Sequence, residues 1–118
     1  MVNVVICDDD QRVLKELKGY VSSFFSEKKI AATYKLFSDG ESAVKENIPY
    51  DLAFIDIEMP GINGLTVAKR LKEANPNVIV FIVTSYQSYL GPYEQQQSRS
   101  PLEKTHLMCY NNSRKPIK

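Results

Sequence analysis

The chain has 118 residues, of which 43% are hydrophobic and 25% are charged, with few Gly and Pro residues. This length and composition predict one globular domain that buries about two thirds of the surface its unfolded form exposes, without help from metals or disulfides. The 15 Lys and Arg residues nearly balance the 14 Asp and Glu residues, which excludes a strongly basic nucleic-acid binder and an acidic tail protein.

The two cysteines, Cys7 and Cys109, fit neither a disulfide scaffold nor a zinc site, because no CxxC or Cys/His spacing surrounds them. Cys7 lies in an apolar run and is expected to pack in the core. The apolar start of the chain lacks a basic leader and soon reaches three aspartates, so it is not a signal peptide. No window approaches the roughly 20 apolar residues that span a bilayer. We therefore expect a cytoplasmic protein that binds neither membranes nor, directly, nucleic acid.

Apolar periodicity divides the chain into alternating strands and helices. Runs rich in Val, Ile and Phe are typical of strands buried on both faces, whereas apolar residues at three- and four-residue steps indicate amphipathic helices. In chain order, the pattern predicts strands over 2–6, 30–37, 51–57 and 78–83, and helices over 11–28, over 40–47 and from Leu65 to the turn at 75–77. Asp9 or Asp10 is placed to cap the first helix, and Ser38 has capping-box spacing at the second. The alternation predicts a doubly wound α/β fold with a parallel sheet.

Polar residues gather where the predicted strands end. They are, in chain order, Asp8, Asp9, Asp10, Asp56, Glu58, Thr84 and Ser85. In sheets of this topology ligands bind outside the carboxyl ends of the strands. Carboxylates about 5 Å apart, at an effective dielectric of about 20, repel by roughly 3 kcal/mol per pair, so the site requires a cation. Oxygen donors favour Mg²⁺ over zinc or copper.

Asp56 differs from the other acidic residues because it ends a buried strand, which fixes its position. A fixed carboxylate beside Mg²⁺ can attack phosphorus and form an acyl phosphate. Catalysis would then consist mostly of positioning and charge neutralisation.

The pattern changes after Leu90. Residues 91–101 are polar and broken by Gly and Pro, only 106–110 has the character of a short strand, and 111–118 lacks a helical stripe. The sequence therefore does not define a fourth helix, a fifth strand or a fifth helix. A sheet edge left open by a missing fifth strand would invite pairing between chains, which predicts a homodimer or a domain swap.

Residues 1–90 resemble the receiver domain of bacterial two-component response regulators, most closely the LytTR-type regulators. The resemblance rests on VVICDDD, DLAFIDIEMPGINGL and VIVFIVTSY, which are specific when they occur together in this order and spacing. It implies a flavodoxin-like receiver fold over 1–90. Residues 91–118 are then an atypical segment that completes the receiver or is partly disordered, and no output domain is expected in this chain.

The resemblance also implies roles for individual residues. Asp56 is then the phospho-acceptor, Asp8 and Asp9 hold Mg²⁺ together with it, and the main-chain carbonyl of Glu58 is a further ligand. Thr84 supplies the hydroxyl that turns toward the phosphoryl group. A sensor histidine kinase donates that group, and an unidentified downstream protein receives the signal. The domain is expected to act as a switch with autocatalytic phosphoryl transfer and autodephosphorylation, rather than as a conventional enzyme.

Receiver domains also use a lysine that contacts the phosphoryl group and is followed by proline, and here the chain departs from the pattern. Spacing from Thr84 selects Lys104, which lacks the following proline and has Pro101 in place of the usual aromatic residue. Lys115 keeps the Lys-Pro-Ile sequence but lies later in the chain. Both lysines stay open as candidates, with Lys104 preferred on spacing.

Two other functions compete with a phospho-accepting switch. A degenerate receiver would keep the fold and the acidic pocket but act only by binding partner proteins. A flavodoxin-like cofactor binder would need a glycine- or hydroxyl-rich loop after the first strand to hold a phosphate. Three aspartates occupy that position and would repel it.

Overall fold

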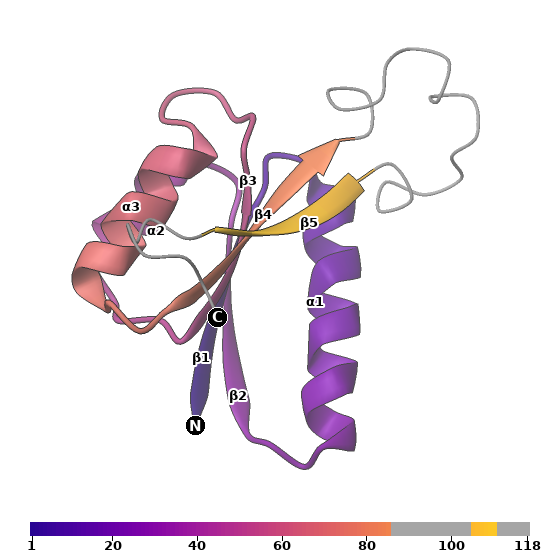
Figure 1. Cartoon of the computed structure of the whole chain (residues 1–118). Helices are drawn as coiled ribbons and strands as arrows, with labels where there is room; N and C mark the ends of the chain where they lie inside the picture. The colour runs from indigo at the N-terminus through magenta and orange to yellow at the C-terminus, as the bar shows by residue number, and fades with distance from the viewer. Residues whose placement is uncertain (86–104, 111–118) are drawn as a thin grey trace.

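The structure, a computed structural model, describes residues 1–85 and 105–110 (Figure 1). Its strands are β1 (Val2–Cys7), β2 (Ala32–Phe37), β3 (Leu52–Asp56), β4 (Ile79–Ser85) and β5 (Thr105–Tyr110), and its helices are α1 (Gln11–Glu27), α2 (Gly40–Lys45) and α3 (Gly64–Ala74). Every element predicted up to residue 85 is present, with bounds shifted by a residue or two. Within the described ranges, no helix combines the length and the apolar character that crossing a membrane requires.

The strands form one sheet in the order β2-β1-β3-β4-β5. The first four strands in sequence are parallel, which confirms the predicted doubly wound α/β fold. The register places Cys7 beside Ile55, and Asp56 beside Val83. Because parallel strands end at the same edge, the carboxyl ends of β1, β3 and β4 lie next to one another.

The fifth strand runs antiparallel to β4, with Ser85 paired to Thr105 and Val80 paired to Tyr110. A short strand over 106–110 was predicted, but neither its neighbour nor its direction. The predicted open edge on β4 is wrong, because β5 occupies it. The predicted positions of a fourth and a fifth helix fall in 86–104 and 111–118, outside the described residues.

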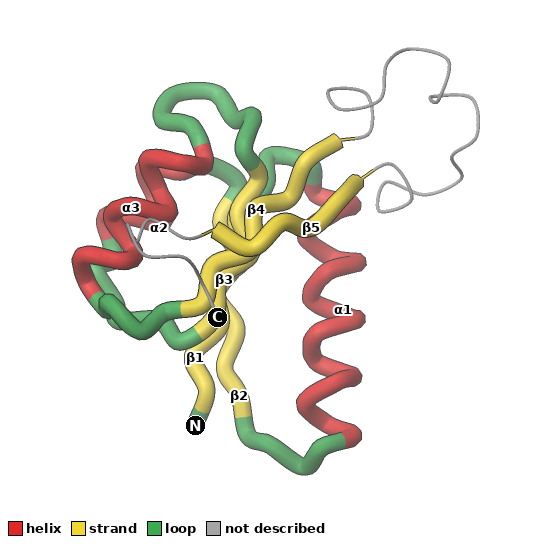
Figure 2. Tube along the Cα trace, viewed as in Figure 1, coloured by secondary structure: helices red, strands yellow, loops and turns green. Residues whose placement is uncertain are grey.

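The helices lie on both faces of the sheet, as Figure 2 shows, with α2 and α3 on one face and α1 on the other. Successive strand residues point to opposite faces, so β1, β3 and β4 each supply buried residues to both cores. The core on the α2 and α3 face includes Val5, Cys7, Ala53, Ile55, Val67, Ala68, Leu71, Val80 and Ile82. The core on the α1 face includes Val4, Ile6, Val13, Leu14, Leu17, Phe54 and Val83.

Side-chain caps fix where the first two helices begin. The Asp10 carboxylate accepts a hydrogen bond from the Arg12 N–H at 2.9 Å, which confirms one of the two predicted caps of α1. At α2 the cap is Asp39, which accepts from the Ser42 N–H at 2.7 Å. The prediction of Ser38 as this cap is wrong, because the residue one place later has the extended backbone and the carboxylate that reach the first turn.

Candidate functional site

Three aspartates meet at the carboxyl edge of the sheet. Asp8 and Asp9 follow β1, and Asp56 is the last residue of β3. One carboxylate oxygen from each lies within 4.8 Å of the other two. Asp8 is 4% exposed, whereas Asp56 is half-buried and Asp9 is exposed. The cluster is therefore closed toward the core and open toward solvent.

Main-chain N–H groups orient two of the three carboxylates. The Asp10 N–H donates to Asp8 Oδ1 at 2.9 Å, and the Glu58 N–H donates to Asp56 Oδ1 at 3.2 Å. In both cases the donor follows the acceptor by two residues, which is the geometry of an Asx turn. The backbone turns at the two strand ends thus hold these carboxylates in place.

Burial and mutual repulsion change the acidity of the cluster. Burial is the largest cause that raises the pKa of Asp8 from 3.8 to about 6, and the charges of Asp9 and Asp10 add to it. Burial also raises the pKa of Asp56 from 3.8 to about 7, with the charges of Asp8 and Asp9 adding. The hydrogen bonds from Asp10 and Glu58 lower these pKa values in part. Ionising the whole cluster is therefore unfavourable unless a cation compensates.

The donor set fits a hard divalent cation. Carboxylate oxygens are the ligands that Mg²⁺ prefers, usually with water completing an octahedron. No Lys or Arg among the described residues forms an ion pair with any of the three aspartates. A bound cation would remove the repulsion that raises the pKa of two of them. The chemistry of these residues thus agrees with the predicted Mg²⁺ site.

Cys7 lies directly before the cluster and packs into the core. Its Sγ is 3.6 Å from Met59 Sδ, and the thiol donates to the main-chain oxygen of Asp39 at 3.3 Å. Burial, followed by the charge of Asp39, raises the pKa of Cys7 to about 12. The thiol is protonated and inaccessible, which confirms a packing role.

A glycine at the start of α3 supports the backbone of Asp56, and the sequence analysis did not single it out. The Gly64 N–H donates to the Ile57 carbonyl at 3.0 Å, and Asn63 caps the helix by accepting from the Thr66 N–H at 3.0 Å. A Cβ at Gly64 would overlap the carbonyl group of Asp56. The missing side chain therefore lets α3 approach the end of β3. The available signal was a glycine at a helix start just after a Pro-Gly turn.

Thr84 and Glu58 are described only in part. Asp56 pairs with Val83, so the main chain of Thr84 is one residue further along β4, while its side chain lies outside the described residues. Glu58 contributes the N–H described above, and the predicted ligand role of its carbonyl stays a prediction. The two candidate lysines lie outside the described residues: Lys104 and Lys115.

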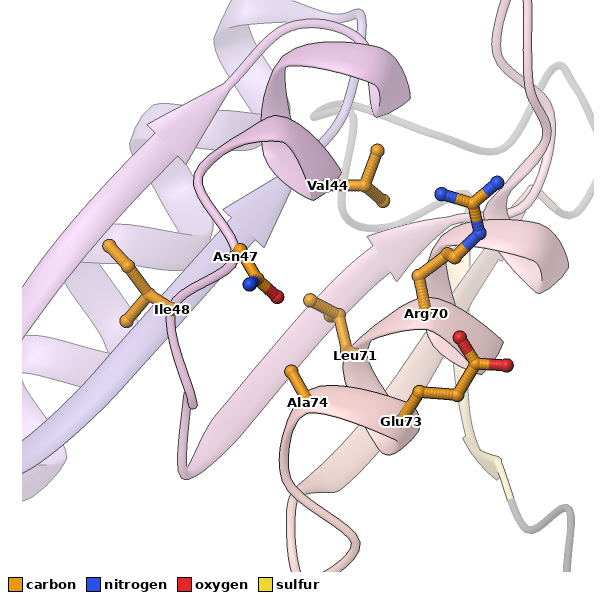
Figure 3. Close-up of a pocket in the computed structure, with 7 residues that line it drawn as sticks. All are labelled: Val44, Asn47, Ile48, Arg70, Leu71, Glu73 and Ala74. Atoms are coloured by element: carbon orange, nitrogen blue, oxygen red, sulfur yellow. The ribbon is translucent and has the colours of Figure 1, made fainter.

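A pocket of about 360 Å³ lies between α2 and α3 (Figure 3). It is lined by Val44, Asn47, Ile48, Arg70, Leu71, Glu73 and Ala74. The lining residues of α3 come from its second half, whereas the first residue of α3 is the one that contacts Asp56. None of the three aspartates lines this pocket, so it is separate from the acidic cluster.

Comparisons with known proteins agree with this geometry. The family model described as response regulator receiver domain matches residues 4–96. A cyclic di-GMP phosphodiesterase of Thermotoga maritima is 32% identical over 85 residues, which cover 72% of this chain and 22% of that protein. The sensory transduction protein LytT of Oceanobacillus iheyensis is 42% identical over 41 residues, which cover 33% of this chain and 17% of that protein.

A solved structure supports the same assignment. The response regulator protein TrrA of Thermotoga maritima, crystallised in complex with Mg²⁺ and BeF, superimposes with a TM-score of 0.61 at 28% identity, over 75% of this chain and 74% of that one. The chain spans 22% to 39% of the length of the first curated relatives it matches. The family match covers most of the chain. The strand order and the aspartate cluster of this chain agree with that match. The chain belongs to the response regulator receiver domain family, whose members accept a phosphoryl group in two-component signalling.

Proposed function

We propose that Asp56 is the residue that accepts the phosphoryl group, and that a sensor histidine kinase donates it. Mg²⁺ is held by Asp8, Asp9, Asp56 and the main-chain carbonyl of Glu58. The observation that carries this proposal is the meeting of three carboxylates within 4.8 Å, one of them at the end of the central strand of the sheet. A degenerate receiver would keep the same cluster, so what disfavours it is the match to the receiver domain family and to response regulators.

The transfer is a substitution at phosphorus. A carboxylate oxygen of Asp56 forms a bond to phosphorus while the phosphorus–nitrogen bond of the donor phosphohistidine breaks, and the histidine nitrogen keeps the electron pair. Dephosphorylation is a hydrolysis: water attacks phosphorus, and the phosphorus–oxygen bond to Asp56 breaks. Inorganic phosphate then leaves, and the Asp56 carboxylate is restored. Mg²⁺, when bound, neutralises charge on the phosphoryl oxygens.

The protein's own contribution is placement. The Glu58 N–H fixes one oxygen of Asp56 at 3.2 Å, and Gly64 holds the end of β3 against α3. These contacts restrict the motion of Asp56 before the donor arrives, which lowers the entropy cost of the reaction. The Thr84 hydroxyl contacts the new phosphoryl group, and Lys104, with Lys115 as the alternative, supplies a positive charge to it.

The wider organisation is part of the proposal. Residues 1–90 are the family-like part of the receiver in this proposal, and the atypical segment 91–118 completes it; the support for this is β5, which adds to the sheet beside β4. The protein works in the cytoplasm, and a downstream protein reads the phosphorylated state.

Intact-mass spectrometry tests the proposal directly. Wild-type protein incubated with Mg²⁺ and acetyl phosphate is expected to gain one phosphoryl group, and Asp56→Asn none. The matched control is Asp51→Asn, which changes the same residue type just before β3, at the opposite end of the strand. Asp51→Asn is expected to be phosphorylated like the wild type. A folded wild-type protein that gains nothing, or an Asp56→Asn variant that still gains the group, contradicts the proposal.

A further inference from the structure

The loop between β3 and α3, residues 57–63, contains the proposed carbonyl ligand of Glu58 and has one buried side chain. Within this range, all of which the structure describes, Met59 alone is buried, at 8% exposed, while Glu58 before it and Pro60 after it are exposed. The Glu58 carbonyl is part of the peptide bond that joins Glu58 to Met59. Because a peptide unit is planar and rigid, the position of Met59 restricts where that carbonyl points.

Met59 packs against Cys7, the last residue of β1. Its Sδ lies 3.6 Å from the Cys7 Sγ, so the two sulfur atoms are in contact. Cys7 is fully buried and is followed directly by Asp8, one of the three aspartates of the cluster. Met59 in turn directly follows Glu58. The contact between the two sulfur atoms therefore joins, from the core side, two main-chain segments that each continue into the acidic cluster.

The Cys7 thiol also contacts the turn after β2. Its single proton is donated to the main-chain oxygen of Asp39 at 3.3 Å, so the contact with Met59 is one of packing. The residue after Asp39, Gly40, lies so close to the loop after β3 that a Cβ there would be 2.8 Å from Ile62 Cγ1. The turn after β2 and the loop after β3 are thus in contact with each other, and Cys7 contacts both.

The rigidity of a cation site affects which cation it binds. Mg²⁺ requires a nearly ideal octahedron with oxygen ligands at about 2.0 to 2.1 Å, whereas Ca²⁺ accepts irregular sites with ligands at about 2.3 to 2.6 Å. Residues behind the ligands hold them in place, and losing such a residue weakens metal binding. Loosening a site of this kind therefore costs more affinity for Mg²⁺ than for Ca²⁺.

We propose that Cys7 and Met59 are positioning residues of the Mg²⁺ site. Their contact fixes the separation between the Asp8 carboxylate and the Glu58 carbonyl, and so raises the affinity for Mg²⁺ relative to Ca²⁺. This inference rests on the proposed function, from which it takes the set of ligands. Neither sulfur atom binds the ion, because the Cys7 thiol is buried and donates to Asp39, and Mg²⁺ prefers oxygen ligands.

Two-dimensional amide NMR spectra of the full chain, titrated separately with magnesium chloride and calcium chloride, measure both dissociation constants. The amide signals of Asp10 and Glu58 report on the site directly, because these N–H groups donate to the carboxylates of Asp8 and Asp56. The same spectra show whether each variant is folded. The quantity compared between variants is the ratio of the two dissociation constants.

Met59→Ala is expected to weaken Mg²⁺ binding about tenfold and Ca²⁺ binding much less. Cys7→Ala removes only the sulfur atom on the other side of the contact, and is expected to change the ratio in the same direction. Met59→Leu refills the space and is expected to keep the wild-type ratio. The matched control is Leu71→Ala, which truncates a similarly buried side chain in the second half of α3. This control is expected to lower stability without changing the ratio.

The outcomes separate this inference from the proposed function. A wild-type chain that binds no Mg²⁺ overturns both. A wild type that binds Mg²⁺ and is phosphorylated, with Met59→Ala and Cys7→Ala variants that keep its ratio, overturns the inference alone, and Cys7→Ala decides the matter if Met59→Ala does not fold. A ratio that changes equally in Leu71→Ala also overturns it, because a general loss of stability would then explain the change.

Discussion

The two faces of the sheet are covered very differently in the described residues. On the α2 and α3 face, residues such as Val67 and Ala68 are fully buried against β1, β3 and β4. On the α1 face, Ile79, Tyr20 and Phe24 are more than half exposed. The closely packed face is the one that supports Asp56, whose carbonyl contacts Gly64 of α3. The comparison indicates that the closest packing occurs where the acidic cluster must be held, since α3 meets the end of β3 there without an intervening side chain.

The largest expected effect comes from a pair of glycine substitutions, one on each face. Gly64→Ala places a Cβ into the carbonyl group of Asp56 and is expected to destabilise the protein by about 3 kcal/mol, with loss of phosphorylation. Gly19→Ala in exposed α1 meets no atom within 4 Å and is expected to stabilise it by about 0.5 to 1 kcal/mol. Urea unfolding of both variants measures the two changes. Equal effects would show that the Cβ added at Gly64 is accommodated as easily as the one at Gly19, which would contradict the close approach of α3 to Asp56.

A second pair of substitutions compares a covered and an uncovered apolar residue. Leu71→Ala removes a side chain that is 4% exposed on the α2 and α3 face, and is expected to cost about 2 to 3 kcal/mol of unfolding free energy. Ile79→Ala on the α1 face is expected to cost about 0.5 kcal/mol or less. Thermal melting at a concentration where the chain is monomeric distinguishes them. A large loss from Ile79→Ala would mean that this residue is covered in solution.

The smallest effect is expected from the acidic cluster at the carboxyl edge of the sheet, as a dependence of stability on pH. Folding raises the pKa of Asp8 to about 6 and that of Asp56 to about 7, both above the ordinary 3.8. The two carboxyl groups therefore contribute their full stabilisation of the folded state below about pH 4, where both are protonated. This stabilisation is lost as the pH rises through these two values. Between pH 5 and pH 8 we expect the metal-free protein to lose on the order of 1 kcal/mol after allowing for solvent screening.

The control for this titration is Asp56→Asn, which removes one of the two groups and is expected to flatten the profile. Addition of Mg²⁺ at pH 8 is expected to raise the melting temperature of the wild type more than that of the variant. A wild-type profile that rises steadily from pH 5 to pH 8 without metal would contradict the assignment of these two raised pKa values.

Much of this fold could be predicted from the sequence, because its signals are local. The apolar runs ending at Cys7 and Asp56 identify buried parallel strands, and the spacing of Val13, Leu14 and Leu17 identifies α1. The acidic cluster could be predicted as well, since the topology brings the carboxyl ends of β1 and β3 to one edge.

The features that could not be predicted depend on contacts between distant segments. The direction of β5 is set by pairing with β4, and the residues of β5 carry no local signal that favours antiparallel over parallel. The role of Gly64 depends on how closely α3 approaches β3, which periodicity does not measure. The choice of Asp39 over Ser38 as the cap of α2 depends on which residue has the extended backbone, and helix ends are set within one residue by such detail.

The antiparallel direction of β5 determines where the chain leaves the sheet. The chain enters β5 at Thr105, opposite Ser85 and beside the acidic edge, and it leaves at Tyr110, opposite Val80 near the start of β4. A parallel last strand would have released the chain at the acidic edge instead. A reporter or domain fused after Tyr110 would therefore depart from the end of the sheet remote from Asp56.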